Sequence, residues 1–276
     1  MRVELSGISC DNLRDAIDRS TDVEHAVPFA FNRGQRIHYT IDGSGPLVIL
    51  QHGLLLDAES WRRAGIVAAL AGRYRIACID SLGHGRSDKP SDAAFYGQEQ
   101  RAGDIAAVLD ALESERAHVI GHSMGGWLAI GMAKFFPSRL SSLVIGGWNL
   151  LGGVPATPSG PMTFERLMDF AKRTAPELVN WVTPAFEPGL RACFDALGQL
   201  AQAKDAVLNL PVPVMLWSGR EDANCDPMQA FAAANGLRSL TTSGDHLGMI
   251  FRHASEAASG LLAFLDTRMP QAPNRA

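Results

Sequence analysis

A serine stands between two glycines in Gly121-His122-Ser123-Met124-Gly125, and this spacing is typical of a serine nucleophile on a sharp turn. The preceding run, Ala117 to Gly121, is apolar like a buried strand, and apolar residues at helical spacing follow from Met124 to Phe136. Glycines on both sides relieve crowding where a strand turns directly into a helix. The Ser123 hydroxyl would then lie near the positive end of that helix, which favours negative charge on a substrate. We predict that Ser123 is a nucleophile rather than only a helix cap.

A serine alcohol is a weak nucleophile at neutral pH, so it requires a histidine as general base and a carboxylate that orients this histidine. His246 and His253 are the two histidines downstream of Ser123. His246 lies in a short loop before the last predicted helix, Gly248 to Asp266, whereas His253 falls within that helix. We predict that His246 is the base and His253 an exposed helical residue; helix capping is the alternative role for His246.

Candidates for the carboxylate cluster in one loop after the predicted strand Val212 to Trp217. The loop contains three carboxylates, Glu221, Asp222 and Asp226. Asp226 precedes Pro227, an order that is typical of a helix N-cap. Asp245 is excluded because a residue adjacent to His246 in the chain cannot easily face its imidazole ring.

The elements that must position these residues alternate between short apolar runs and amphipathic segments from residue 45 to 148, as in βαβ units around a parallel sheet. Upstream, Val27 to Phe31 and Arg36 to Ile41 should form an antiparallel hairpin at the sheet edge, joined through Asn32 to Gln35. The predicted strands of the sheet are Leu47 to Leu50, Arg75 to Asp80, Ala117 to Gly121, Leu143 to Gly147, Val212 to Trp217 and Gly236 to Thr241. The predicted helices are Glu59 to Ala71, Gln98 to Leu112, Met124 to Phe136, Thr163 to Arg173, Gly189 to Leu208 and Gly248 to Asp266.

This alternation breaks after Trp148, where a segment rich in glycine and proline begins. We predict that residues 150–205 form a helical insertion that packs over the sheet as a lid. The core domain would then comprise residues 26–149 and 206–276. Residues 1–25 are an N-terminal extension that could hold one short helix, Asp11 to Arg19.

Composition excludes several classes of protein. The chain has 276 residues, of which 46% are hydrophobic and 20% charged, as in a globular protein with an ample core. The net charge of −4 and the lack of a run of basic residues argue against nucleic-acid binding. Apolar stretches are far shorter than the roughly 20 residues of a membrane span. The start of the chain does not look like a secretory signal, so we expect a cytoplasmic protein.

Four cysteines, Cys10, Cys78, Cys193 and Cys225, lie far apart without metal-ligand spacing. We therefore predict reduced thiols, no disulfide framework and no metal site. No cofactor is expected, and the partner would be a small-molecule substrate. The sequence leaves the oligomeric state open between a monomer and a homodimer.

The chain resembles the α/β-hydrolase family over about residues 27 to 266. The resemblance rests on GHSMGG at 121–126, on HG at 52–53, and on DSLGHGRSD from Asp80 to Asp88, which is similar to the loop after the family's fourth strand. It implies an α/β-hydrolase fold with an eight-stranded, mostly parallel sheet, flanking helices and a helical cap. It also implies a triad in the chain order serine, acid, histidine.

The resemblance assigns the remaining roles at the site. Asp222 stands three residues after Gly219, as in the family's usual G-x-x-D, so Asp222 is favoured as the acid over Asp226. The backbone N–H groups of Leu54 and Met124 are the implied oxyanion donors. His52, which precedes the oxyanion glycine, is then expected to shape this loop rather than to act as a base.

Family members that open epoxides or remove halide use an aspartate where this chain has Ser123, which argues against both reactions. We predict a serine hydrolase that cleaves a small to medium, largely uncharged carboxylic ester or lactone through an acyl-enzyme. Carbon–carbon bond hydrolases and perhydrolases of the same fold share the triad and stay alternatives, and a ligand-binding receptor is a further one.

Large apolar side chains suggest where the acyl group would bind. Trp148, Phe170 and Trp181 are the candidate pocket residues, with packing of the lid onto the sheet as the alternative role for the lid aromatics. The predicted lid has no basic cluster, so an uncharged substrate is expected.

Overall fold

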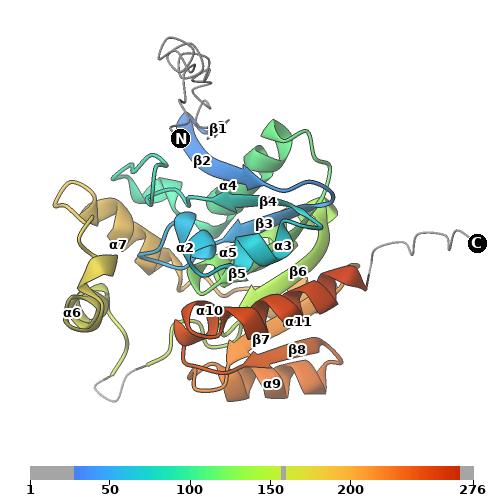
Figure 1. Ribbon diagram of the computed structural model, residues 1–276. Helices are drawn as coiled ribbons and strands as arrows, with labels where there is room; N and C mark the ends of the chain where they lie inside the picture. Colours follow the sequence, from blue (N-terminus) through green and yellow to red (C-terminus); the bar gives the residue numbers. More distant parts are fainter. Residues whose placement is uncertain (1–27, 157–159, 268–276) are drawn as a thin grey trace, which may run out of the picture.

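The computed structural model describes residues 28–156 and 160–267, so the predicted helix Asp11 to Arg19 lies outside the described residues. Within them, the strands are β1 (Phe29–Asn32), β2 (Gln35–Asp42), β3 (Leu47–Gln51), β4 (Arg75–Ile79), β5 (Ala117–His122), β6 (Leu140–Gly146), β7 (Val214–Gly219) and β8 (Arg238–Thr242). They form one sheet in the order β1-β2-β4-β3-β5-β6-β7-β8, seen edge to edge in Figure 1. β2 is antiparallel to β1 and β4, and the other neighbours are parallel. The predicted eight-stranded, mostly parallel sheet is therefore confirmed.

The antiparallel edge of the sheet is the predicted hairpin, with a two-residue turn. Arg33 and Gly34 occupy the turn with φ of 50° and 74°. Two successive residues in the left-handed region are the signature of the hairpin turn whose twist matches its strands. The positive φ therefore falls on Arg33 and not on Asn32, whose side chain instead donates a hydrogen bond to Asp104 at 2.8 Å.

Helices cover both faces of the sheet, and two apolar cores result. One core lies beneath α4 (Gln98–Ala111) and α5 (Met124–Phe135), and the other beneath α3 (Ile66–Leu70) and α11 (Ala254–Asp266). Every residue of β3 and of β5 is buried, because both faces of these central strands are covered. Cys78, Cys193 and Cys225 are free, buried thiols.

Three segments that periodicity predicts as single helices are each two helices. Residues 59–71 divide into α2 (Glu59–Arg63) and α3 at Gly65, which has φ of 80°. Residues 189–208 divide into α7 (Glu187–Ala196) and α8 (Ala203–Leu208), with Gln202 at φ of 63° before α8. A left-handed residue cannot continue an α-helix, so each break is local and abrupt.

The third break separates α10 (Gly248–Phe251) from α11, and His253 directly precedes α11. His253 is thus a partly buried residue at a helix start, and its prediction as an exposed residue within a helix is wrong. No helix in the described part of the chain is long and apolar enough to cross a membrane.

The connection from β6 to β7 carries α6 (Phe164–Thr174), the 3-10 helix η3 (Pro176–Leu178) and α7 to one side of the sheet (Figure 1). A small apolar cluster joins these elements, and it includes Leu55 from the loop after β3. The other buried members of the cluster are Phe164, Met168, Ala171, Val179 and Leu190. Leu55 therefore links the segment predicted as a lid to the loop predicted to carry an oxyanion donor.

Candidate active site

Ser123 lies on a strained turn between β5 and α5. Its φ of 58° is uncommon for a residue with a side chain, and its N–H donates to the carbonyl of Gly146 at 2.8 Å. A Cβ atom on Gly121 would lie 1.9 Å from the carbonyl oxygen of Gly125, and one on Gly125 would lie 2.0 Å from that of Gln51. Both glycines of the motif are therefore required by close backbone approaches.

His246 connects Ser123 to Asp222. Its Nε2 atom lies 2.9 Å from Ser123 Oγ, and its Nδ1 atom lies 2.7 Å from Asp222 Oδ2. With a neutral imidazole and an ionised acid, the Ser123 hydroxyl donates to Nε2 and Nδ1–H donates to the carboxylate. Ser123 follows β5, Asp222 follows β7 and His246 follows β8. The carboxyl ends of these parallel strands meet at one edge of the sheet.

The Asp222 carboxylate is buried, and it accepts hydrogen bonds from two groups. Burial by itself would raise the pKa of Asp222, but the hydrogen bond from His246 and that from the Asn224 N–H, at 2.9 Å, hold this pKa below its usual value. Asp226 lies in the first turn of α9 (Cys225–Ala234) and is not its N-cap, which is Asn224. The structure therefore brings Asp222 to His246, and no contact in the described residues joins Asp226 to it.

The loop that carries His246 packs tightly against the end of β7. A Cβ atom on Gly219 would lie 2.2 Å from the carbonyl oxygen of Gly244, whose own φ is 92°. Asp245 accepts from the Gly248 N–H at 2.7 Å and pairs with Arg252 at 2.8 Å, so its carboxylate is engaged away from the imidazole. The direction of His246 thus follows from backbone contacts on both sides of it.

His122, the residue before the predicted nucleophile, holds the backbone of the predicted base. Its Nε2–H donates to the carbonyl oxygen of His246 at 2.9 Å, and the two rings are 4.8 Å apart. Burial, with a smaller effect of His246, lowers the pKa of His122 to about 3. His122 is therefore neutral at physiological pH. Sequence spacing gives no sign of this contact, because 124 residues separate the partners.

The loop after β3, residues 52–58, is here called the oxyanion loop, and its first peptides are oriented by His52. His52 Nε2 accepts from the Ser81 N–H at 3.0 Å, so the proton is on Nδ1, which donates to the carbonyl oxygen of Gly53 at 2.7 Å. In a trans peptide the next N–H points the opposite way, so the N–H of Leu54 faces away from His52.

This oxyanion loop passes directly beside the predicted nucleophile. A Cβ atom on Gly53 would lie 3.1 Å from Ser123 Cβ. Among the described residues, the N–H groups of Leu54 and Met124 donate to no protein acceptor outside helices and strands. Both predicted donors therefore have N–H groups that a ligand oxygen could accept from.

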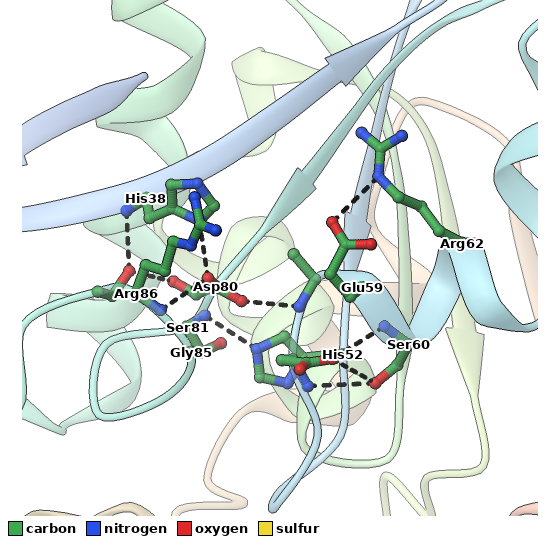
Figure 2. Close-up of polar contacts among 12 residues, drawn as sticks. His38, His52, Glu59, Ser60, Arg62, Asp80, Ser81, Gly85 and Arg86 are labelled. Carbon is green, nitrogen blue, oxygen red and sulfur yellow. Dashed lines mark hydrogen bonds and ion pairs between the residues drawn. The ribbon is translucent and has the colours of Figure 1, made fainter. Parts of the chain in front are cut away.

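Asp80 and Ser81 hold the oxyanion loop by hydrogen bonds, which Figure 2 shows. Asp80 accepts from the Ala58 N–H at 2.7 Å and from the Arg86 N–H at 2.8 Å, and it contacts His38 Nδ1 at 2.7 Å. Burial would raise the pKa of Asp80, but these hydrogen bonds outweigh it and lower the pKa to about 2. With His52 bound to the Ser81 N–H, two consecutive residues thus fix both ends of the oxyanion loop.

Two of the three candidate pocket residues differ sharply in exposure. Phe170 is 54% exposed, whereas Trp148 is 4% exposed, and its Nε1 has no hydrogen-bond partner among the described residues. Trp181 Nε1 donates to the carbonyl of Leu55 at 3.4 Å and lines a cavity of about 250 Å³. The other lining residues are Leu55, Leu56, Asp57, Arg63, Gly85, Lys89, Glu177, Leu178 and Phe186. No cluster of metal ligands occurs in the part of the chain that the structure describes.

Comparison with known proteins identifies the family. The model of the alpha/beta hydrolase fold matches residues 46–186, so the chain belongs to this family. Epoxide hydrolase B of Mycobacterium tuberculosis is 37% identical over 144 residues, which are 50% of this chain and 40% of that protein. An uncharacterised protein of the same species is 38% identical over 119 residues, 43% of this chain and 34% of that one. The chain thus matches less than half the length of these curated relatives.

Solved structures share the fold over most of the chain. The enol-lactonase from Burkholderia xenovorans LB400 has a TM-score of 0.69 and 24% identity, covering 87% of this chain and all of that one. A thermophilic esterase from Thermogutta terrifontis has a TM-score of 0.70 and 20% identity, covering 87% of this chain and 98% of that one. At these identities the likeness shows the fold alone.

Proposed function

We propose that the protein is a serine hydrolase of a carboxylic ester or lactone, with Ser123, His246 and Asp222 as its catalytic triad. The observation that carries this proposal is the position of His246, within hydrogen-bond distance of both Ser123 Oγ and the buried Asp222 carboxylate. A nucleophile, a base and a group that orients the base are the three parts that acyl transfer needs. The similarity to the esterase and the enol-lactonase in fold is compatible with this chemistry.

In the first half of the reaction, Ser123 Oγ bonds to the carbonyl carbon while its proton passes to His246 Nε2. The carbonyl double bond becomes an oxyanion. When the double bond re-forms, the bond to the leaving alcohol breaks, and the alcohol takes the proton from His246. Water then repeats both steps on the acyl-enzyme, which releases the acid and restores Ser123.

The proposed oxyanion donors are the N–H groups of Leu54 and Met124. Their support is the direction of the Leu54 N–H, set by His52, and the place of Met124 at the start of α5, where the helix end is positive. One such donor typically contributes about 2.7 to 4 kcal/mol to the stability of the transition state.

We propose a small to medium acyl group next to the cavity between the oxyanion loop and the helices after β6. Five apolar side chains, among them Leu55 and Trp181, line this cavity together with two acidic and two basic residues. Residues 150–205 would act as the cap over this site. The epoxide hydrolase names among the relatives favour a different reaction, but Ser123 stands where that reaction is expected to use an aspartate. The expectation of a cytoplasmic protein stays a prediction.

The test is turnover of p-nitrophenyl esters and of lactones of graded chain length by the wild-type chain and by Ser123→Ala. We expect Ser123→Ala to keep the fold by circular dichroism and to lose at least about 10³-fold in kcat. The wild-type rate should rise from acidic to neutral pH, because only neutral imidazole accepts the serine proton. Equal turnover by both proteins would contradict the triad. If the protein does not cleave esters but shows Ser123-dependent cleavage of a carbon–carbon bond, it is a carbon–carbon bond hydrolase. Ser123-dependent perhydrolysis without ester cleavage would favour a perhydrolase.

A further inference from the structure

Arg101 is a buried arginine beside the predicted nucleophile. It lies in the first turns of α4 and is 1% exposed. Its Nη1 atom is 3.3 Å from the Met124 sulfur, and Met124 directly follows Ser123. Arginine is almost never fully buried unless it is paired, so its partners decide its role.

The Arg101 guanidinium lacks the partners that a buried cation normally has. Its Nε and Nη2 atoms make no hydrogen bond among the described residues, and its Nη1 contacts a thioether, a weak acceptor. Leaving an ionised group buried without an anion is strongly unfavourable, and a guanidinium cannot escape by losing its proton.

Neighbouring carboxylates are already engaged. Asp104 follows one turn later on α4, but its Oδ1 atom accepts from Asn32 at 2.8 Å and from Arg33 at 2.7 Å. Asp80 is bound by His38 and two backbone N–H groups. The Asp104 Oδ2 atom has no hydrogen-bond partner among the described residues. Burial raises the pKa of Asp104, and the charges of Arg33, which is exposed, and of Arg101 both oppose this effect. Arg101 therefore shares the Asp104 carboxylate with Arg33, and among the described residues it makes no hydrogen bond to a carboxylate.

We propose that Arg101 is a positioning residue that stabilises, through Met124, the negative charge formed at the oxyanion donors during catalysis. This inference rests on the proposed function. A methionine side chain places its sulfur at most about 5 to 6 Å from its own backbone nitrogen, so the Arg101 guanidinium lies within about 9 Å of the Met124 N–H. The oxyanion of the reaction is then a further anion within range of Arg101, which makes no hydrogen bond to an anion among the described residues.

The charge of Arg101 also preserves the orientation of the other donor. His52 must stay neutral, because protonated Nε2 could not accept from the Ser81 N–H. Burial lowers the pKa of His52, and the charge of Arg101 lowers it further, against the opposing effect of Asp80. The pKa of His84, whose Nε2 faces the Leu55 N–H at 3.4 Å, is also lowered, by burial first and then by His52 and Arg101.

The experiment compares Arg101→Met, Arg101→Lys and a control, Arg62→Met, in the full chain. Methionine keeps the length of the side chain without its charge, and lysine keeps the charge. Arg62 is a partly buried arginine whose charge is already balanced by Asp42 and Glu59. The readouts are kcat and KM with p-nitrophenyl butyrate, inhibition by phenylboronic acid, and the melting temperature.

We expect Arg101→Met to lower kcat by about 10- to 30-fold and to change KM less than twofold, as a unit charge about 9 Å away at an effective dielectric constant near 20 would produce. The inhibition constant of phenylboronic acid, which forms an anionic tetrahedral adduct with a serine, should rise by a similar factor. Arg101→Lys should recover most of both losses. Arg101→Met should melt no lower than wild type, because it removes a buried charge that makes no hydrogen bond to an anion among the described residues. Arg62→Met should leave kcat unchanged.

A residue that only supports the fold would behave in the opposite way. A lower melting temperature for Arg101→Met, with kcat and boronate inhibition unchanged, would overturn the inference, as would a kcat loss that lysine does not recover. If Ser123→Ala abolishes turnover while Arg101→Met is fully active, only the role of Arg101 fails. If the wild-type chain neither turns over esters nor binds phenylboronic acid, the proposed function fails, and this inference with it.

Discussion

At the scale of single residues, the contact between Asp222 and His246 does more than orient a ring. The carboxylate requires the proton on Nδ1, which leaves the Nε2 lone pair facing Ser123 at 2.9 Å. Asparagine at position 222 could donate to Nδ1 and stabilise the opposite tautomer, in which Nε2 carries the proton and cannot accept another. The charge of the acid and its geometry therefore both matter.

Asp222→Asn should lower kcat by about 10³- to 10⁴-fold, whereas Asp226→Asn should stay within about threefold of wild type. The two carboxylates lie four positions apart, and only that of Asp222 contacts His246, so Asp226 is the matched control. Steady-state kinetics with one p-nitrophenyl ester decides the matter, with circular dichroism to check folding. The reverse ranking would move the acid to Asp226.

The buried Asp80 carboxylate makes stability sensitive to acid. Its pKa of about 2 in the folded chain lies below its ordinary value of 3.8, so Asp80 stabilises the fold above about pH 4, and this stability is lost as the pH falls toward 2. The difference corresponds to about 2 kcal/mol. Asp80→Asn should lower the free energy of unfolding at pH 7 by about 2 to 4 kcal/mol and should weaken its dependence on acid. Urea unfolding at pH 7 and pH 3 measures both effects. If the free energy of unfolding of Asp80→Asn depends on pH as strongly as that of wild type, the ionised Asp80 carboxylate is not the source of the acid sensitivity.

The three residues of the proposed triad could be singled out from the sequence because each follows a recognisable strand within a short motif. Arg101 and His122 could not be assigned their contacts this way. Arg101 is one more charged residue in an amphipathic segment, and only packing shows that it faces Met124 and, among the described residues, makes no hydrogen bond to an anion. The expectation of an uncharged substrate considered only the charges of the lid, whereas the buried cation Arg101 lies on a core helix.

At the scale of elements, the loop Asp80 to Asp88 and the oxyanion loop form one unit. Gly85 has φ of 49°, and a Cβ atom there would lie 2.1 Å from the Asp80 carboxyl carbon. Gly65, between α2 and α3, has φ of 80°, but a Cβ atom there would meet nothing within 4 Å. A substitution at Gly65 would therefore strain the backbone alone, whereas one at Gly85 would also displace Asp80.

Gly65→Ala should cost about 1 kcal/mol of stability, from the left-handed backbone alone, and should keep kcat. Gly85→Ala should cost more, since Asp80 must move, and should lower kcat at least tenfold, because Asp80 holds the oxyanion loop at Ala58. Thermal melts and kinetics of the two variants check this difference. Equal effects on kcat would show that Asp80 does not govern the site.

Helix boundaries show what periodicity misses. Apolar spacing continues through Gly65, Gln202 and His253, so each pair of helices looks like one. The breaks are set by backbone conformation and by packing of the second helix in a new direction. One of them matters for the site, because α10 begins two residues after His246 and its first turn is capped by Asp245.

At the scale of the whole molecule, strand and helix alternation predicts a parallel sheet but not the order of its strands. The order, with β3 between β4 and β5, places the oxyanion loop beside the turn that holds Ser123, with Gln51 paired to Gly121. That neighbourhood was predicted from family resemblance, since no local pattern encodes which strands pair. The long connection after β6 reaches back to the same edge and packs on Leu55.

Two aromatic residues of this connection, Trp181 and Phe170, allow a prediction about substrate size. Trp181 is half-buried, donates to the Leu55 carbonyl, and its ring lies 5.6 Å from that of His84. It lines the cavity together with Leu55 of the oxyanion loop. Phe170, on α6, is more than half exposed and does not line the cavity. Both are aromatic residues of the predicted lid, and the second serves as control for the first.

Trp181→Ala should enlarge the cavity and shift the preferred acyl chain length toward longer esters, with a modest loss of melting temperature. Phe170→Ala should leave both the chain-length profile and the melting temperature close to wild type, because exposed side chains contribute little to packing. The measurement is kcat/KM for p-nitrophenyl esters from acetate to decanoate with each variant. An unchanged profile in Trp181→Ala together with a clear loss of stability would mean that Trp181 only packs the lid onto Leu55. A shift caused by Phe170→Ala instead would place the acyl group on the outer side of α6.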